Sequence, residues 1–150
     1  MVVESVVESV VVLVAESVAV LAVVSAAASV AAWGRTSRSE APPEPFADLD
    51  DVLSLAKCDN IAIKISGACT LSHQTFPYDD IWGPLGKIFE AFGFDRCMWG
   101  TDWTRAVALL TYEQGVEAFR VTDNLSIDER SELMGGTLEK IYKWSPQSIE

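Results

Sequence analysis

The sequence predicts an α/β protein with parallel strands, and three observations support this prediction. From residue 46 onward, strand-like apolar segments alternate with helical segments, which is the pattern of a parallel sheet covered by helices. The two expected strands, 61–66 and 96–100, are short and apolar, as buried parallel strands are. A helical segment over 78–92 lies between them and provides the crossover that parallel strands require.

The first half of this unit contains a short helix and the first strand. Asp48 can cap a helix that continues to Lys57, because apolar residues follow at helical spacing. After the turn at Asp59 and Asn60, the strand 61–66 (IAIKIS) ends at Gly67. Its alternation places the three isoleucines on one face. The opposite face then carries Ala62, Lys64 and Ser66.

The second half contains the second strand and the last helices. A loop over 68–77 holds His73, the only histidine, and the helix 78–92 follows with Gly93 as its stop signal. The strand 96–100 (RCMWG) then opens into Thr101-Asp102-Trp103. Further helices are predicted over 112–122, from a capping box at Ser126 and Glu129 to Met134, and from Thr137 to Trp144 after a break at Gly135-Gly136.

Composition excludes several classes of protein. The formal net charge is −11 and no basic run is present, so we expect no nucleic-acid partner, since phosphate binding needs clustered Lys and Arg. Three widely spaced cysteines form neither a CxxC pair nor a zinc-finger spacing. A reducing, cytoplasmic location is therefore the expected one, with membrane association as the alternative.

Residues 1–34 differ sharply from the rest of the chain. Residues 1–32 consist almost only of Val, Ala, Ser, Glu and Leu, with a repeat of about four residues. We predict a low-complexity helical segment, followed by a proline-rich linker over 35–45 and the folded domain over 46–150. Because a four-residue repeat drifts around a helix of 3.6 residues per turn, it produces no fixed amphipathic stripe.

Three origins of this segment remain open. A signal peptide is disfavoured because its first residues carry Glu where Lys or Arg is expected. A membrane helix over 10–32 has suitable length, but Glu16 would cost roughly 2.5–3.5 kcal/mol near the membrane centre. The favoured interpretation is low-complexity sequence from a displaced reading frame, joined to a truncated domain.

Three stretches carry a family resemblance: NIAIKISG (60–67), FEAFGFDRCMWGTDW (89–103) and LSIDERSELMGGTLEKIYKW (125–144). In this order they resemble the C-terminal end of the amidohydrolase-related family, whose members are TIM-barrel hydrolases, lactonases and decarboxylases. There the seventh strand reads N-x-x-x-K-x-S-G and the eighth reads R-x-x-W-G-[ST]-D-W. The resemblance implies that residues 46–150 are a C-terminal fragment of a (β/α)8 barrel, with two parallel strands plus helices.

Asp102 is the main candidate catalytic residue. It follows the carboxyl end of a predicted parallel strand, which is the rim where TIM-barrel active sites lie. The resemblance implies that Asp102 is a metal ligand, a general base, or both, and it implies a divalent metal such as zinc or manganese. The family's histidine ligands on earlier strands have no match here, and catalytic zinc usually takes three protein ligands. We therefore expect this chain not to retain the metal.

The remaining candidates would contact a small-molecule substrate. Lys64 and Ser66 share one face of the first strand, while Trp103 and His73 lie in segments that follow strand ends. The predicted function is metal-dependent hydrolysis of a lactone, amide or ester, or decarboxylation, by a fragment that is incompetent alone. The alternative is a non-catalytic remnant or membrane-tethered fragment that folds only by association, since two parallel strands leave open sheet edges.

Overall fold

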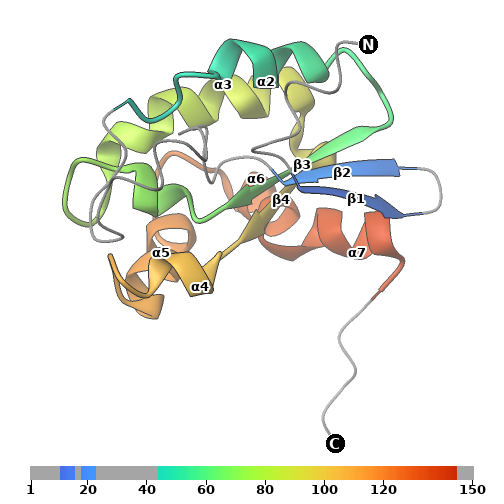
Figure 1. The fold of residues 1–150 in the computed structure, drawn as a ribbon. Helices are drawn as coiled ribbons and strands as arrows, with labels where there is room; N and C mark the ends of the chain where they lie inside the picture. Colours follow the sequence, from blue (N-terminus) through green and yellow to red (C-terminus); the bar gives the residue numbers. More distant parts are fainter. Residues whose placement is uncertain (1–10, 16–17, 23–43, 145–150) are drawn as a thin grey trace, which may run out of the picture.

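The computed structural model describes residues 11–15, 18–22 and 44–144 of the 150-residue chain. Its sheet has the strand order β1-β2-β3-β4. β2 and β3 run parallel, as do β3 and β4, whereas β1 and β2 are antiparallel. Figure 1 shows these strands side by side, with helices above and below the sheet. The strands are β1 (Val11–Ala15), β2 (Val18–Ala22), β3 (Ile61–Ser66) and β4 (Cys97–Gly100).

The prediction of an α/β unit with two parallel strands is confirmed in β3, α3 (Trp82–Phe92) and β4. β3 has the bounds that the isoleucine alternation predicts. β4 begins one residue later than predicted, because Arg96 ends a 3-10 turn, η4 (Phe94–Arg96). Two further 3-10 turns, η2 (Ala68–Leu71) and η3 (Asp79–Ile81), lie between β3 and α3.

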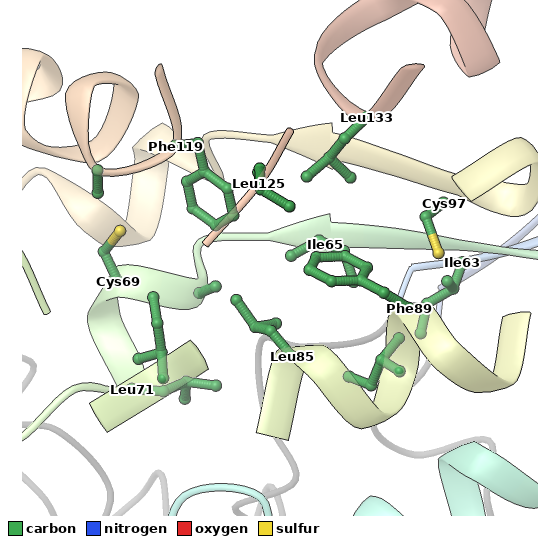
Figure 2. Packing of buried hydrophobic residues seen from close by; sticks show 14 of the residues in the cluster. Ile63, Ile65, Cys69, Leu71, Leu85, Phe89, Cys97, Phe119, Leu125 and Leu133 are labelled. Atoms are coloured by element: carbon green, nitrogen blue, oxygen red, sulfur yellow. The ribbon is translucent and has the colours of Figure 1, made fainter. Parts of the chain in front are cut away.

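One face of the β3–β4 pair forms the main core. Ile63, Ile65 and Cys97 have no exposed surface and belong to one apolar cluster with Leu85 and Phe89 of α3. Figure 2 shows the α3 side chains directed at β3 from below the strand. The isoleucines therefore face a helix, which confirms the predicted alternation of β3. α2 (Leu49–Leu55) packs on α3 from outside, and its predicted capping residue Asp48 makes no side-chain capping bond.

The opposite face is less apolar. Ala62 and Met98 are buried there against Leu138 and Ile141 of α7 (Thr137–Tyr142), which runs along the other side of the sheet from α3 (Figure 1). Toward the carboxyl ends of the strands, this face continues with Lys64, which is only half-buried. The two faces of the sheet thus differ. The face toward α3 is apolar, whereas the face toward α7 becomes polar near the strand ends.

The C-terminal helices follow the predicted order with one addition and one correction. The addition is α4 (Trp103–Ala106), which comes directly after Asp102. The break predicted at Gly135-Gly136 is wrong, because a π-helical turn (Glu132–Gly136) carries α6 (Ile127–Ser131) into α7. Thr137 is therefore no cap. It is fully buried, and its hydroxyl donates to the carbonyl of Phe94 at 2.7 Å.

Two capping boxes hold the other helix starts. The predicted one at Ser126 and Glu129 is confirmed for α6. A second one, at Thr111 and Gln114, begins α5 (Tyr112–Arg120). Reciprocal bonds of this kind satisfy two N–H groups that a helix start otherwise leaves without partners.

The helical prediction for the N-terminal segment is wrong where the structure describes it. Val11–Ala15 and Val18–Ala22 are strands, paired as a hairpin, and β2 adds in parallel to the edge of β3. β-Branched valines favour strands, and the free N–H and C=O groups of β3's edge offer them partners. The rest of residues 1–34, and most of the 35–45 linker, lie outside the described residues.

Among the described helices, none combines the length and apolarity needed to cross a membrane. Of the membrane helix considered over 10–32, the two described stretches are the strands β1 and β2.

Candidate active site at the strand ends

Asp102 lies two residues beyond the end of β4, where α4 begins. Its backbone is left-handed (φ 46°, ψ 49°), and its half-buried side chain makes no capping bond to α4. A non-glycine residue in this conformation costs roughly 1–2 kcal/mol. Strained backbone of this kind concentrates at active sites, where the surrounding structure maintains it. The carboxylate is therefore not simply a helix cap.

Gly67 brings the end of β3 against Asp102. The N–H of Gly67 donates to the carbonyl of Gly100 at 3.1 Å, which joins the two strand ends. A Cβ on Gly67 would lie 3.0 Å from the Cβ of Asp102 and 3.4 Å from its Oδ2. Gly67 also has a left-handed φ of 64°, which glycine adopts without strain. The glycine thus lets the carboxylate lie directly beside the end of β3.

Lys64 and Ser66 meet over Gly100 on the polar face of the sheet. Ser66 is paired with Gly100 in the register of β3 and β4, and Lys64 with Met98. A Cβ placed on Gly100 would lie 2.5 Å from Cε of Lys64, and 3.3 Å from both its Nζ and the hydroxyl of Ser66. The lysine side chain therefore leans toward the carboxyl end of the strands. We call Lys64, Ser66, Gly67, Gly100 and Asp102 the strand-end cluster.

The other two predicted substrate contacts lie differently. Trp103 is the first residue of α4, 36% exposed, and it packs edge-on against Tyr112 with ring centroids 5.4 Å apart. His73 is exposed, and its backbone N–H donates to Oδ2 of Asp80 at 2.8 Å. Within the described residues, no hydrogen bond or ion pair connects the side chain of His73 to the strand-end cluster.

A small pocket lies at the same strand ends on the face that α5 covers. Its walls include Thr70, Trp99 and Phe119, together with Gly67 and Gly100. Cys69 also lines this pocket, and burial raises the pKa of its thiol to about 12. The thiol is therefore protonated at neutral pH and is no nucleophile.

The residues around Asp102 do not fit a complete metal site. In residues 44–144 and the two described N-terminal strands, no group of three His, Cys, Asp or Glu side chains is placed to hold a metal ion. Asp102 can supply one carboxylate, and catalytic zinc needs about three protein ligands. No step of the chemistry is therefore assigned to a metal held by these residues.

Sequence reasoning located Asp102, Lys64 and Ser66 but missed the two glycines between them. The sequence pattern marks Gly67 only as a strand end and Gly100 only as part of a motif. The signal was available in the register, because parallel strands place residues 66 and 100 side by side. What the sequence does not contain is the direction of the lysine side chain, which requires the fold.

The chain is similar to known proteins in sequence and in fold. The chain is 41% identical over 59 residues to 4-sulfomuconolactone hydrolase of Rhizobium radiobacter, a match that covers 39% of this chain and 18% of that protein. An amidohydrolase structure from Burkholderia multivorans with bound zinc superposes with a TM-score of 0.55 at 25% identity, covering 65% of this chain and 37% of that one.

A further structure, from Pseudomonas putida and assigned as 2-pyrone-4,6-dicarboxylic acid hydrolase, superposes with a TM-score of 0.54 at 22% identity. It covers 73% of this chain and 41% of that one. The chain thus spans less than half of the length of each of these proteins. The described residues have the fold of part of an amidohydrolase TIM barrel, as predicted from the strand motifs. The amidohydrolase family model matches residues 33–144, and the chain belongs to that family.

Proposed function

We propose that this chain contributes the general base and substrate contacts of a hydrolase that opens a lactone or a related ester or amide carbonyl. The observation that carries the proposal is Asp102, half-buried at the strand ends in a strained left-handed conformation, with no capping bond to occupy its carboxylate. Decarboxylation is the other reaction that the family resemblance implies. Hydrolysis is favoured because the names of two matched proteins both describe hydrolases.

In this proposal, Asp102 accepts a proton from a water molecule as that water attacks the substrate carbonyl. The attack forms the new C–O bond; the bond from the carbonyl carbon to the leaving oxygen or nitrogen then breaks, and Asp102 gives the proton to that leaving atom. Lys64 and Ser66 hold the substrate, while Trp103 provides an apolar wall beside Asp102. His73 is kept as a candidate contact only for a substrate long enough to reach the loop after η2.

A divalent metal would polarise the carbonyl and the attacking water if it were bound. The structural relative from Burkholderia multivorans contains zinc, whereas the described residues here offer one carboxylate and no complete ligand set. We therefore propose that the isolated chain does not retain zinc or manganese. Metal analysis of the purified chain after dialysis tests this directly, and stoichiometric metal would contradict it.

The decisive experiment compares the chain with Asp102→Asn in a pH-indicator assay of lactone opening, with and without added zinc or manganese. Removal of a general base lowers the rate by roughly 10²–10⁴-fold, so any activity of the chain should disappear in the variant. Asp123→Asn is the matched control, because Asp123 is an exposed aspartate in a turn. Lactone turnover that survives Asp102→Asn would reject the proposed role of Asp102.

A second proposal is non-catalytic association of two copies through the open sheet. The observation that favours it is the strand order, which places β1 and β4 at the sheet's edges, where N–H and C=O groups remain available for pairing. Melting temperature should then rise with protein concentration. A concentration-independent melt of a monomer in sedimentation velocity would contradict association.

A further inference from the structure

The side chain of Lys64 occupies a space that is free only because residue 100 is a glycine. Cε of Lys64 occupies the space where a Cβ on Gly100 would stand, 2.5 Å from that position. Real Cβ atoms do not approach other atoms this closely. Any other residue at position 100 would therefore push the lysine side chain away from the strand ends.

Backbone conformation does not explain this glycine. The left-handed glycines of the described chain are Gly67 and Gly93, so Gly100 has no φ that an L-residue would avoid. Gly100 also lies inside the ladder, paired with Ser66, and glycine in a strand interior weakens the strand. A glycine in such a position often marks the close approach of another group. Here that group is Lys64.

The ammonium of Lys64 reaches the strand ends. No hydrogen bond or ion pair is made by its Nζ within the described part of the chain, where the ion pairs are Arg120–Glu117 and Lys140–Glu132. Its neighbour is the hydroxyl of Ser66, since both atoms lie 3.3 Å from the same point above Gly100. A cation and a hydroxyl donor thus lie near the same point on the polar side of the sheet.

We propose that Lys64 and Ser66 bind an oxyanion group of the substrate, a carboxylate or a sulfonate, and that Gly100 positions the lysine for this contact. Both donors suit an oxyanion, because its two or more oxygens can accept one bond from the ammonium and one from the hydroxyl. The inference rests on the proposed hydrolase function and specifies its substrate class as acidic carbonyl compounds. Asp102 would act on the carbonyl, while the acidic group is held on β3.

The first test measures the accessibility of Lys64 in the full chain. An acetylating reagent is applied with succinate, with ethanedisulfonate, and with the neutral dimethyl ester of succinate, and each lysine is quantified by peptide mass spectrometry. Acetylation of Lys64 should fall about tenfold when an acid is present at ten times its dissociation constant. The exposed Lys87 serves as the internal control and should not be protected.

The two acids separate the two sources of the oxyanion. Protection by succinate alone identifies a carboxylate, and protection by ethanedisulfonate alone identifies a sulfonate. Equal protection by both shows that the site recognises oxyanions in general. The proposal would be overturned if neither acid protected Lys64, or if the neutral ester protected it as well as the acids do.

Variants test the role of each residue. Lys64→Met keeps an unbranched side chain out to its Cε and removes the ammonium, so succinate affinity measured by titration calorimetry should fall by about tenfold or more. Gly100→Ala should weaken binding similarly, by displacing the lysine. Lys87→Met and Gly83→Ala are the matched controls, since a Cβ on Gly83 meets nothing within 4 Å. Circular dichroism of each variant confirms that it is folded, and Lys64→Met decides the matter if Gly100→Ala does not fold.

The oxyanion site and the hydrolase reaction can be rejected separately. Binding that depends on Lys64, together with absent lactone turnover, would reject the reaction and keep the oxyanion site. Lactone turnover with an unchanged KM in Lys64→Met would keep the reaction and reject the oxyanion site.

Discussion

The two ends of the β3–β4 pair are built for different purposes. At the amino end, the guanidinium of Arg96 donates to the carbonyls of Phe92, Ala56, Cys58 and Ile61 and lies 5.4 Å from the ring centroid of Phe92. One side chain thus joins α2, the start of β3 and the end of α3. At the carboxyl end, the strand-end cluster has a strained aspartate and a lysine without a partner among the described residues.

This difference matches a general property of TIM barrels, in which the amino end of the strands contributes stability and the carboxyl end contributes chemistry. At the amino end, the guanidinium and the carbonyls form hydrogen bonds with one another. At the carboxyl end, Asp102 and Lys64 keep hydrogen-bonding capacity that is available to a ligand.

The largest effect is expected at the amino end. Arg96→Met should lower the free energy of unfolding by about 2–4 kcal/mol, because it removes charge-assisted hydrogen bonds and leaves several carbonyls without a donor. Unfolding in denaturant, monitored by tryptophan fluorescence, measures this change in the free energy of unfolding. Arg120→Met is the control, since its pair with Glu117 is exposed and should not contribute measurably. Equal stability of Arg96→Met and the wild-type chain would contradict the assigned role of Arg96.

At the carboxyl end, Gly67→Ala should cost about 1–2 kcal/mol, because an L-residue is strained at a φ of 64°. Its new Cβ would also press on Asp102 from 3.0 Å. Gly86→Ala is a control with the opposite sign. It lies inside α3 with open space around it, so the change should stabilise the protein by about 0.5–1 kcal/mol. Equilibrium unfolding of both variants should show a loss of stability in Gly67→Ala and a gain in Gly86→Ala.

Alkaline pH tests a feature that the two ends share. Burial raises the pKa of Cys97, at the amino end, and of Cys69, at the carboxyl end, to about 12 from the ordinary value of 9.0. Stability from the protonated thiols is fully present below pH 9 and is lost as pH rises from 9 toward 12, because the unfolded chain ionises first.

The loss should be about 1 kcal/mol per thiol one pH unit above 9. Unfolding free energies at several pH values measure this slope. Cys97→Ala should reduce the slope, whereas Cys58→Ala should leave it unchanged because Cys58 is exposed. An unchanged slope in Cys97→Ala would show that this thiol is not the cause.

The smallest effect on stability is expected at Asp102. Asp102→Gly removes the strain of a left-handed aspartate but adds chain entropy to the unfolded state. Stability should therefore stay constant or rise by up to about 1 kcal/mol, while any lactone hydrolysis is lost. A clear destabilisation in thermal melts would indicate that Asp102 has a structural role instead.

Much of the α/β unit was predictable from local patterns. The isoleucine alternation gave the bounds and faces of β3, and the Ser126–Glu129 capping box gave the start of α6. Both signals depend on residues close in sequence. The Gly135-Gly136 break failed because a π-helical turn accommodates the two glycines, while the buried Thr137 hydroxyl bonds to a carbonyl 43 residues away.

The helical prediction for the N-terminal segment was wrong for a related reason. Its four-residue repeat lacks the two-residue alternation of a strand, although its valines favour one, and residues 18–22 form a strand beside the edge of β3. Strand preference depends on the available partner more than helix preference does. The sequence alone could not supply that partner.

Periodicity and contiguous motifs are enough to predict the α/β class, the family and the position of Asp102 after a parallel strand. The contact of Gly67 with Asp102, and the path of Lys64 across Gly100 to the strand ends, appear only in the folded chain. Those contacts join residues more than 30 positions apart. Such contacts depend on strand register and side-chain direction, which exist only after the sheet has formed.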